Sequence, residues 1–214
     1  MLIDAINLLT GTILEAVICI IGSGPAGLSL ATELDAAGIS TLLLEAGGLG
    51  PEPDDAGFVD GETAGDPFCA LGITRARGLG GTANLWDTRW DPATTGFRGG
   101  PLDPIDFERR EWVPMSGWPF GRRELDPFYA RAHEFSRFGP FEYEPRHWET
   151  DSARALRFPD GAFETRMWLF GAQRTILGER RAALERSPRA RIVTHAGVVE
   201  LDADPGGSGI RSVR

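Results

Sequence analysis

Two short apolar runs near the N-terminus predict buried parallel strands. The first, Val17–Ile21, is continuously apolar, which is typical of a parallel strand that helices cover on both faces. The second run is Thr41–Leu44. Between them the pattern predicts a helix that ends near Gly38, because glycine favours the left-handed conformation at a helix C-terminus. Its face toward the sheet is predicted to contain Leu28, Leu30, Ala31 and Leu34.

A glycine-rich turn joins the first strand to this helix. Its residues are Gly22, Ser23, Gly24, Pro25, Ala26 and Gly27, which form a GxGxxG pattern. In such a turn the first glycine allows the tight bend, the second lets the backbone approach a diphosphate, and the third lets the helix pack closely on the strand. The helix N-terminus offers free N–H groups and partial positive charge, so the anion site requires no lysine.

An acidic residue closes the second strand. Glu45 lies 18 residues after Gly27, where a carboxylate can accept hydrogen bonds from both hydroxyls of an adenosine ribose. The same charge would repel the extra phosphate of NADP, which leaves NAD or FAD. A glycine turn alone is weak evidence, but the strand, turn, helix and acid agree with one another and predict a dinucleotide site.

A second glycine segment, Gly78–Trp86, contains Gly80, Gly81, Thr82 and Asn84. Consecutive glycines before a hydroxyl residue are suited to a backbone that passes close to a flat ligand. We expect Thr82 or Asn84 to cap a short helix here. The alternative interpretation is a plain turn.

The rest of the chain alternates long loops with a few regular patterns. Residues 47–74 show no periodicity and are predicted to form a loop. Helices are predicted at 122–138 and 175–186, and strands at 191–195, 198–201 and 210–213. The expected fold class is α/β, with a Rossmann-like FAD-binding domain that is incomplete at the C-terminus, because the last strand would leave an unpaired edge. The expected parts are a first βαβ unit (1–46), a loop-rich and helical insertion covering the flavin (47–188) and truncated return strands (189–214).

Composition excludes several classes of function. The first 74 residues contain eleven acidic residues and no basic one, and the net charge of the chain is −9, so nucleic acid is not an expected partner. The chain contains no lysine, which excludes a Walker P-loop and a Schiff-base enzyme. Two unspaced cysteines, Cys19 and Cys69, predict buried thiols rather than a disulfide or a metal site, and a reducing, cytoplasmic location is expected. The apolar N-terminus is interrupted by Asp4 and Glu15 and predicts no membrane span.

Taken together, these residues resemble the bacterial branch of the glucose-methanol-choline oxidoreductases. That family holds FAD in a Rossmann-like domain and oxidises alcohols or sugars beside a second, substrate domain. The segments that carry the resemblance are Ile20–Gly27, Leu44–Gly48, Leu79–Trp86, Pro101–Glu108 and Ser116–Pro119. It implies a small-molecule CH–OH substrate that passes a hydride to flavin N5, and FAD as the cofactor. The cofactor-binding residues implied are Gly22, Ser23, Gly24, Pro25, Ala26, Gly27, Glu45, Ala46, Gly80, Gly81, Thr82, Asn84 and Val198.

The chain departs from the family at the catalytic base. The family's catalytic histidine lies in its C-terminal part, and no residue here aligns with it. His133, His147 and His195 fall in family segments without that role, so we assign no catalytic residue. The chain is therefore expected to be the N-terminal portion of such an enzyme and inactive by itself. The alternatives are a nucleotide-binding fragment without catalysis and, less favoured, an NAD-dependent dehydrogenase.

Overall fold

The chain forms two compact units in the computed structural model, which describes residues 1–53, 57, 61–62, 64–86, 88–89, 95–159, 161–171 and 173–214. The sheet unit comprises Met1–Trp86 and Leu177–Arg214, and the inserted unit comprises Asp87–Ile176. The structure therefore groups residues 47–86 with the sheet.

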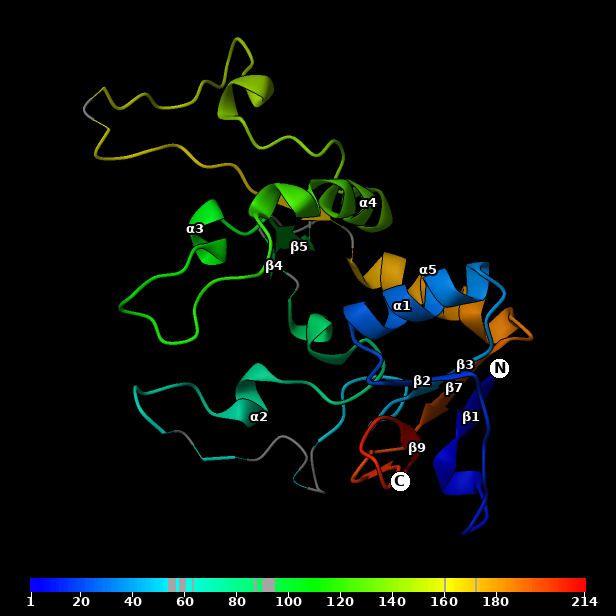
Figure 1. Cartoon of the computed structure of the whole chain (residues 1–214). Helices are drawn as coiled ribbons and strands as arrows, with labels where there is room; N and C mark the ends of the chain where they lie inside the picture. The colour runs from blue at the N-terminus through cyan, green and yellow to red at the C-terminus, as the bar shows by residue number, and fades with distance from the viewer. Residues whose placement is uncertain are drawn as a thin grey trace. The chain divides into compact units, whose positions relative to one another are not determined.

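A four-stranded parallel sheet is the centre of the sheet unit (Figure 1). Its strands, from one edge to the other, are β1 (Leu2–Asp4), β7 (Ala190–Thr194), β3 (Thr41–Leu44) and β2 (Ile18–Ile21). All four residues of β3 are buried, because this strand pairs with β2 on one side and β7 on the other. The predicted strand Thr41–Leu44 is confirmed.

Two helices, α1 (Pro25–Ala36) and α5 (Gln173–Arg186), pack on one face of this sheet (Figure 1). The buried residues of this core are Ile20, Leu28, Ala31, Leu43, Leu79, Ala83, Leu177, Leu184, Ala190 and Ile192. The prediction that Leu30 faces the sheet was wrong, since its side chain is 48% exposed. Two residues after Leu28, it lies about 200° further around the helix and points away from the core.

The opposite face of the sheet has a smaller core. Leu42, Leu44 and Val193 are buried there, and the partly buried residues packed against them are Ile3, Ala5, Leu14, Ala16, Ala196, Val198 and Val213. The prediction of buried thiols was wrong, since Cys69 is exposed and so are Cys19 and Ile21 of the edge strand β2. The expectation that helices cover both faces of this strand was wrong, because a continuous apolar run does not distinguish an edge strand from a central one.

The remaining elements of the sheet unit are short. They are η1 (Ala5–Asn7), α2 (Leu71–Thr74), η2 (Gly81–Leu85) and the antiparallel pair β8 (Leu201–Ala203) and β9 (Ile210–Val213). The strand predicted at 198–201 begins only at Leu201. Of the predicted loop 47–74, residues 54–56, 58–60 and 63 lie outside the described residues.

The inserted unit contains a three-stranded antiparallel sheet and several short helices. Its strands are β4 (Thr88–Arg89), β5 (Thr95–Gly99) and β6 (Leu169–Gly171), and its helices are α3 (Pro104–Phe107), η3 (Arg122–Leu125), α4 (Asp126–Ser136) and η4 (Pro145–Trp148). The helix predicted at 122–138 thus begins as a 3-10 turn and ends at Ser136. In the part of the chain that the structure describes, no helix combines the length and apolar character needed to cross a membrane.

The segment Pro101–Pro119 folds around one buried aromatic side chain. Phe107 contacts Trp118 and Phe120, with ring centroids 5.9 and 6.1 Å away. The Trp118 N–H donates to the Phe107 carbonyl oxygen at 3.1 Å. The two motifs 101–108 and 116–119 therefore form one local structure.

Candidate functional site: a pocket at the glycine turn

A pocket of about 330 Å³ opens at the carboxyl ends of the parallel strands, where ligands bind in open α/β sheets. Of the residues that the sequence predicts at the cofactor, Gly22, Ser23, Gly24, Glu45, Ala46, Gly81, Thr82 and Val198 line it. The pocket is also lined by Ile21, Leu44, Ala76, Arg77, Ala196 and Gly197. Pro25, Ala26, Gly27, Gly80 and Asn84 do not line it.

Two glycines of the turn have different surroundings. A Cβ atom added to Gly24 would meet no other atom within 4 Å, so the space beside it is open to a ligand. A Cβ atom added to Gly27 would lie 2.0 Å from the Gly22 carbonyl oxygen. Gly27 therefore serves the packing of α1 on the turn, whereas Gly24 leaves room in the pocket.

The N-terminus of α1 offers hydrogen-bond donors at this turn. Gly24 is the N-cap residue, and its carbonyl oxygen accepts from the Leu28 N–H at 3.0 Å. Pro25 has no N–H, and the N–H groups of Ala26 and Gly27 have no acceptor within the helix because they belong to its first turn. An anionic group beside Gly24 would thus meet two backbone donors and the positive end of the helix dipole.

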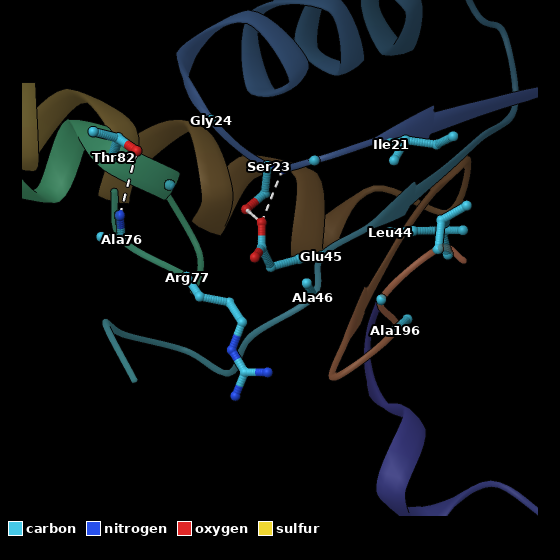
Figure 2. Close-up of a pocket in the computed structure, with 14 residues that line it drawn as sticks. Ile21, Ser23, Gly24, Leu44, Glu45, Ala46, Ala76, Arg77, Thr82 and Ala196 are labelled. Carbon is cyan, nitrogen blue, oxygen red and sulfur yellow. Dashed lines mark hydrogen bonds between the residues drawn. The ribbon is translucent and has the colours of Figure 1, made fainter. Parts of the chain in front are cut away.

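Glu45 is 6% exposed, and its carboxylate connects three segments of the chain. One carboxylate oxygen accepts from the Ser23 N–H at 3.0 Å and from the Ser23 hydroxyl (Figure 2). The other accepts from the N–H groups of Gly47 at 3.0 Å and Gly78 at 3.1 Å. The sequence predicts that ribose hydroxyls bind the Glu45 carboxylate. The structure adds that four protein donors already bond to this carboxylate, so a ribose would share it with them.

Gly80 and Thr82 join the second glycine segment to the site. The Gly80 N–H donates to the Ser23 hydroxyl oxygen at 3.2 Å. The Thr82 hydroxyl oxygen accepts from the Ala76 N–H at 3.3 Å, as Figure 2 shows. A Cβ atom added to Gly81 would lie 3.3 Å from the Gly24 Cα atom. This segment therefore packs directly against the glycine turn.

The predicted short helix is present as η2, but the prediction of its cap was wrong. Its N-cap residue is Gly80, which has no side chain. The Asn84 side-chain amide instead donates to the carbonyl oxygens of Leu79 at 3.0 Å and Gly81 at 2.8 Å. Asn84 thus stabilises the turn from its C-terminal end.

The last side of the pocket follows β7. The Ala196 N–H donates to the Glu45 carbonyl oxygen at 2.8 Å, which holds Ala196, Gly197 and Val198 beside the end of β3. Arg77 lines the pocket, but its side chain points away from Ser23 in Figure 2. It donates to the Pro53 carbonyl oxygen at 3.0 Å.

Each of the three histidines has a polar partner. In the inserted unit, buried His133 contacts the Tyr143 hydroxyl at 3.0 Å and the Gly139 carbonyl oxygen at 3.3 Å, and His147 lies 3.8 Å from a Glu142 carboxylate oxygen. In the sheet unit, His195 lies between Asp4 and Glu52, an arrangement that sequence spacing did not reveal. No group of three or more His, Cys, Asp or Glu side chains among the described residues is placed to hold a metal ion.

Comparison with known proteins identifies the ligand of this turn. Residues 15–48, which include β2, the glycine turn, α1, β3 and Glu45, match the profile of a family described as FAD binding domain. Among curated proteins, none matches the chain. The match and the parallel α/β sheet confirm the predicted Rossmann-like FAD-binding fold, with FAD as the cofactor. The class of protein that they indicate is a flavin-dependent oxidoreductase.

Proposed function

We propose that this chain is the FAD-binding part of an oxidoreductase of the glucose-methanol-choline type, which oxidises CH–OH groups of alcohols or sugars. The observation that carries FAD binding is the open space beside Gly24, at the N-terminus of α1 and next to buried Glu45. FAD supplies the hydride acceptor, at flavin N5. The substrate class rests on the family resemblance.

In this proposal the pocket takes the adenosine diphosphate half of FAD. The diphosphate would lie at Gly24, where backbone N–H groups are available and no side chain intervenes. The ribose would lie at Glu45 and the adenine beside Val198. A volume of about 330 Å³ is near the lower end for small-molecule sites, so the pocket suits one half of a dinucleotide.

Support for the oxidoreductase type comes from the inserted unit. Its motifs 101–108 and 116–119, which resemble the family most specifically, form one local structure around Phe107. A motif whose two parts fold together is more informative than either part by itself.

Competition binding tests this placement. We expect FAD to bind the purified chain and ADP to displace it, because both contain adenosine diphosphate, whereas FMN should not compete. NAD contains the same half, so a control must separate it: only bound flavin gives a visible absorption band after desalting. A preparation that retains NAD and no flavin, or FMN that competes as well as ADP, would contradict the proposal.

A second candidate function is FAD binding without oxidation by this chain. It is favoured by the engagement of all three histidines in hydrogen bonds or ion pairs, since abstraction of a substrate proton needs an available base near flavin N5. Anaerobic incubation with primary alcohols, secondary alcohols and sugars separates the two candidates. Substrate-dependent loss of the flavin band would require a base within the chain, whereas a stable band together with FAD binding supports the second candidate.

A further inference from the structure

His195, Asp4 and Glu52 form a charged network at the edge of the pocket, although they lie far apart in sequence. The His195 Nδ1 atom is 2.8 Å from an Asp4 carboxylate oxygen, and its Nε2 atom is 3.2 Å from a Glu52 carboxylate oxygen. Asp4 ends β1, His195 follows β7 and Glu52 lies in the loop after β3. The network therefore joins three segments at the carboxyl ends of the strands.

The geometry favours a protonated imidazole. A neutral histidine has one N–H donor and one acceptor, but here both ring nitrogens face carboxylates, which only accept. Hydrogen bonding to Asp4 is the main cause that raises the pKa of His195 above its ordinary value, with a smaller contribution from Glu52. Both carboxyl pKa values are lowered. The main cause for Asp4 is its hydrogen bond with His195, and the main cause for Glu52 is the hydrogen bond from the Gly48 N–H, with a smaller contribution from His195.

Hydrogen bonds connect this network to the walls of the pocket. Glu52 accepts from the Gly48 N–H at 2.9 Å, its own N–H donates to the Arg77 carbonyl oxygen at 3.0 Å, and its carboxylate lies 3.9 Å from the Arg77 guanidinium. The His195 backbone N–H donates to the Gly47 carbonyl oxygen at 3.0 Å. The next residue, Ala196, lines the pocket, as does Arg77. Loss of the network would remove one of the restraints on the segments that contain Arg77 and Ala196.

We propose that protonated His195 is a positioning residue for FAD: bound between Asp4 and Glu52, it holds the pocket walls in place, and FAD binds more weakly once it is neutral. This inference rests on the proposed placement of the adenosine diphosphate half in the pocket. The charged groups that face the network are Asp4 from β1, Glu52 from the loop after β3 and, across Glu52, Arg77.

The sign of the pH dependence follows from the direction of each shift. Because the pKa of His195 is raised, its contribution is complete below its unfolded value of 6.5 and is lost as the pH rises through the higher folded value. Because the pKa values of Asp4 and Glu52 are lowered, both remain charged through the neutral range. FAD affinity should therefore fall on the alkaline side of neutrality.

The first test uses the unmodified chain. We expect the FAD dissociation constant to rise about two- to fivefold from pH 6 to 8.5, the range for partly exposed ion pairs. The diphosphate of FAD keeps its charge over this interval, so the ligand does not contribute to the pH dependence.

By linkage, NMR titration of the His195 ring should show a higher pKa with FAD bound than without it. If His195 had a purely structural role, its pKa would not change when FAD binds. Identical His195 pKa values with and without FAD would therefore overturn the inference.

Variants separate this inference from the proposed function. His195→Asn suits the position, because His195 has a φ of +51° and asparagine tolerates the left-handed region. It should bind FAD with one pH-independent affinity, equal to the alkaline value of the parent, and Glu52→Gln should move the inflection to lower pH. His147→Asn, which alters a histidine–glutamate pair in the inserted unit, is the matched control and should retain the parent's profile.

The outcomes distinguish the two proposals. If Gly24→Val abolishes FAD binding, but the pH profile of the unmodified chain is flat or His195→Asn keeps the profile of the unmodified chain, the pocket placement stands and the role of His195 is wrong. If Gly24→Val leaves FAD binding intact, the placement itself is wrong. Circular dichroism of each variant identifies any that fail to fold, and the NMR titration of the unmodified chain then decides.

Discussion

The two walls of the pocket are built in different ways. The turn wall, Gly22–Gly24, is continuous in sequence between β2 and α1, and it lies within the segment that matches the FAD-binding family. The loop wall is assembled from residues 76–77, 81–82 and 196–198, which are distant in sequence. Glu45 accepts from the Gly78 N–H beside this wall, and the Glu52 backbone N–H donates to the Arg77 carbonyl oxygen within it. The comparison indicates that local steric rules shape one wall and long-range polar contacts the other, so mutations in each should have different consequences.

Gly27→Val should give the largest effect, and that effect should be on stability. The added Cβ atom would lie 2.0 Å from the Gly22 carbonyl oxygen, so α1 would have to move away from β2. Overpacking costs typically about 1–3 kcal/mol and occasionally more, and we expect a loss at the upper end because backbone must shift here. Urea denaturation measures the loss, and an unchanged midpoint would show that the turn wall tolerates a side chain at its packing position.

Gly24→Val should weaken FAD binding and leave the stability of the fold nearly unchanged. No protein atom lies within 4 Å of the added Cβ atom, and the φ of −60° suits an L residue, so the midpoint of unfolding should change little. The valine would occupy the space proposed for the diphosphate, and we expect FAD affinity to fall about 100-fold or more, equal to about 2.7 kcal/mol. Flavin-fluorescence titration measures it. Retention of stoichiometric FAD would show that the diphosphate lies elsewhere.

Glu45→Gln tests the junction of the two walls. The glutamine NH₂ group would face N–H donors of either Ser23 or of Gly47 and Gly78, where the carboxylate now accepts. Leaving buried donors without an acceptor costs about 2 kcal/mol, so both the unfolding midpoint and the FAD affinity should fall.

Exposed Glu62 supplies the matched control for this substitution, and Glu62→Gln should change neither quantity. If Glu45→Gln weakened FAD binding but left the unfolding midpoint unchanged, the carboxylate would contact FAD without contributing to the stability of the fold.

Sequence patterns predicted the turn wall better than the loop wall. The strand Thr41–Leu44, the helix after Gly24 and the placement of Glu45 at the strand end followed from hydrophobic spacing and glycine positions, which act over short distances. The pairing of His195 with Asp4 spans 191 residues and that with Glu52 spans 143. No local pattern encodes such contacts, because the first depends on β1 lying next to β7 in the sheet and the second on the course of the loop after β3.

The errors on η2 and β2 have different causes. Thr82 and Asn84 have side chains that suit an N-cap, but the chain enters η2 through Gly80, and both side chains bond backbone groups of the neighbouring residues 76–81 instead. An apolar run shows that β2 is a strand, whereas its position at the sheet edge depends on the order of all four strands.

Ser23→Ala should give the smallest effect, and it tests the contact between the walls most directly. Ser23 belongs to the turn wall and is fully buried, yet its hydroxyl donates to Glu45 and accepts from the Gly80 N–H of the neighbouring segment. Alanine fits the space but leaves that N–H without its acceptor, at a cost of about 1 kcal/mol. A chain of this length should then melt about 2–4 °C lower.

Ser29→Ala is the control for this last substitution. The Ser29 hydroxyl bonds the Pro25 carbonyl oxygen within α1, a contact that slightly disfavours a helix, so alanine there should be neutral or mildly stabilising. FAD affinity should fall in Ser23→Ala and not in Ser29→Ala, because only the former loosens the segment 80–82 beside the turn. Equal melting temperatures and equal FAD affinities in the two variants would contradict this prediction. They would show that the hydrogen bond from the Gly80 N–H to Ser23 does not couple the turn wall to the loop wall.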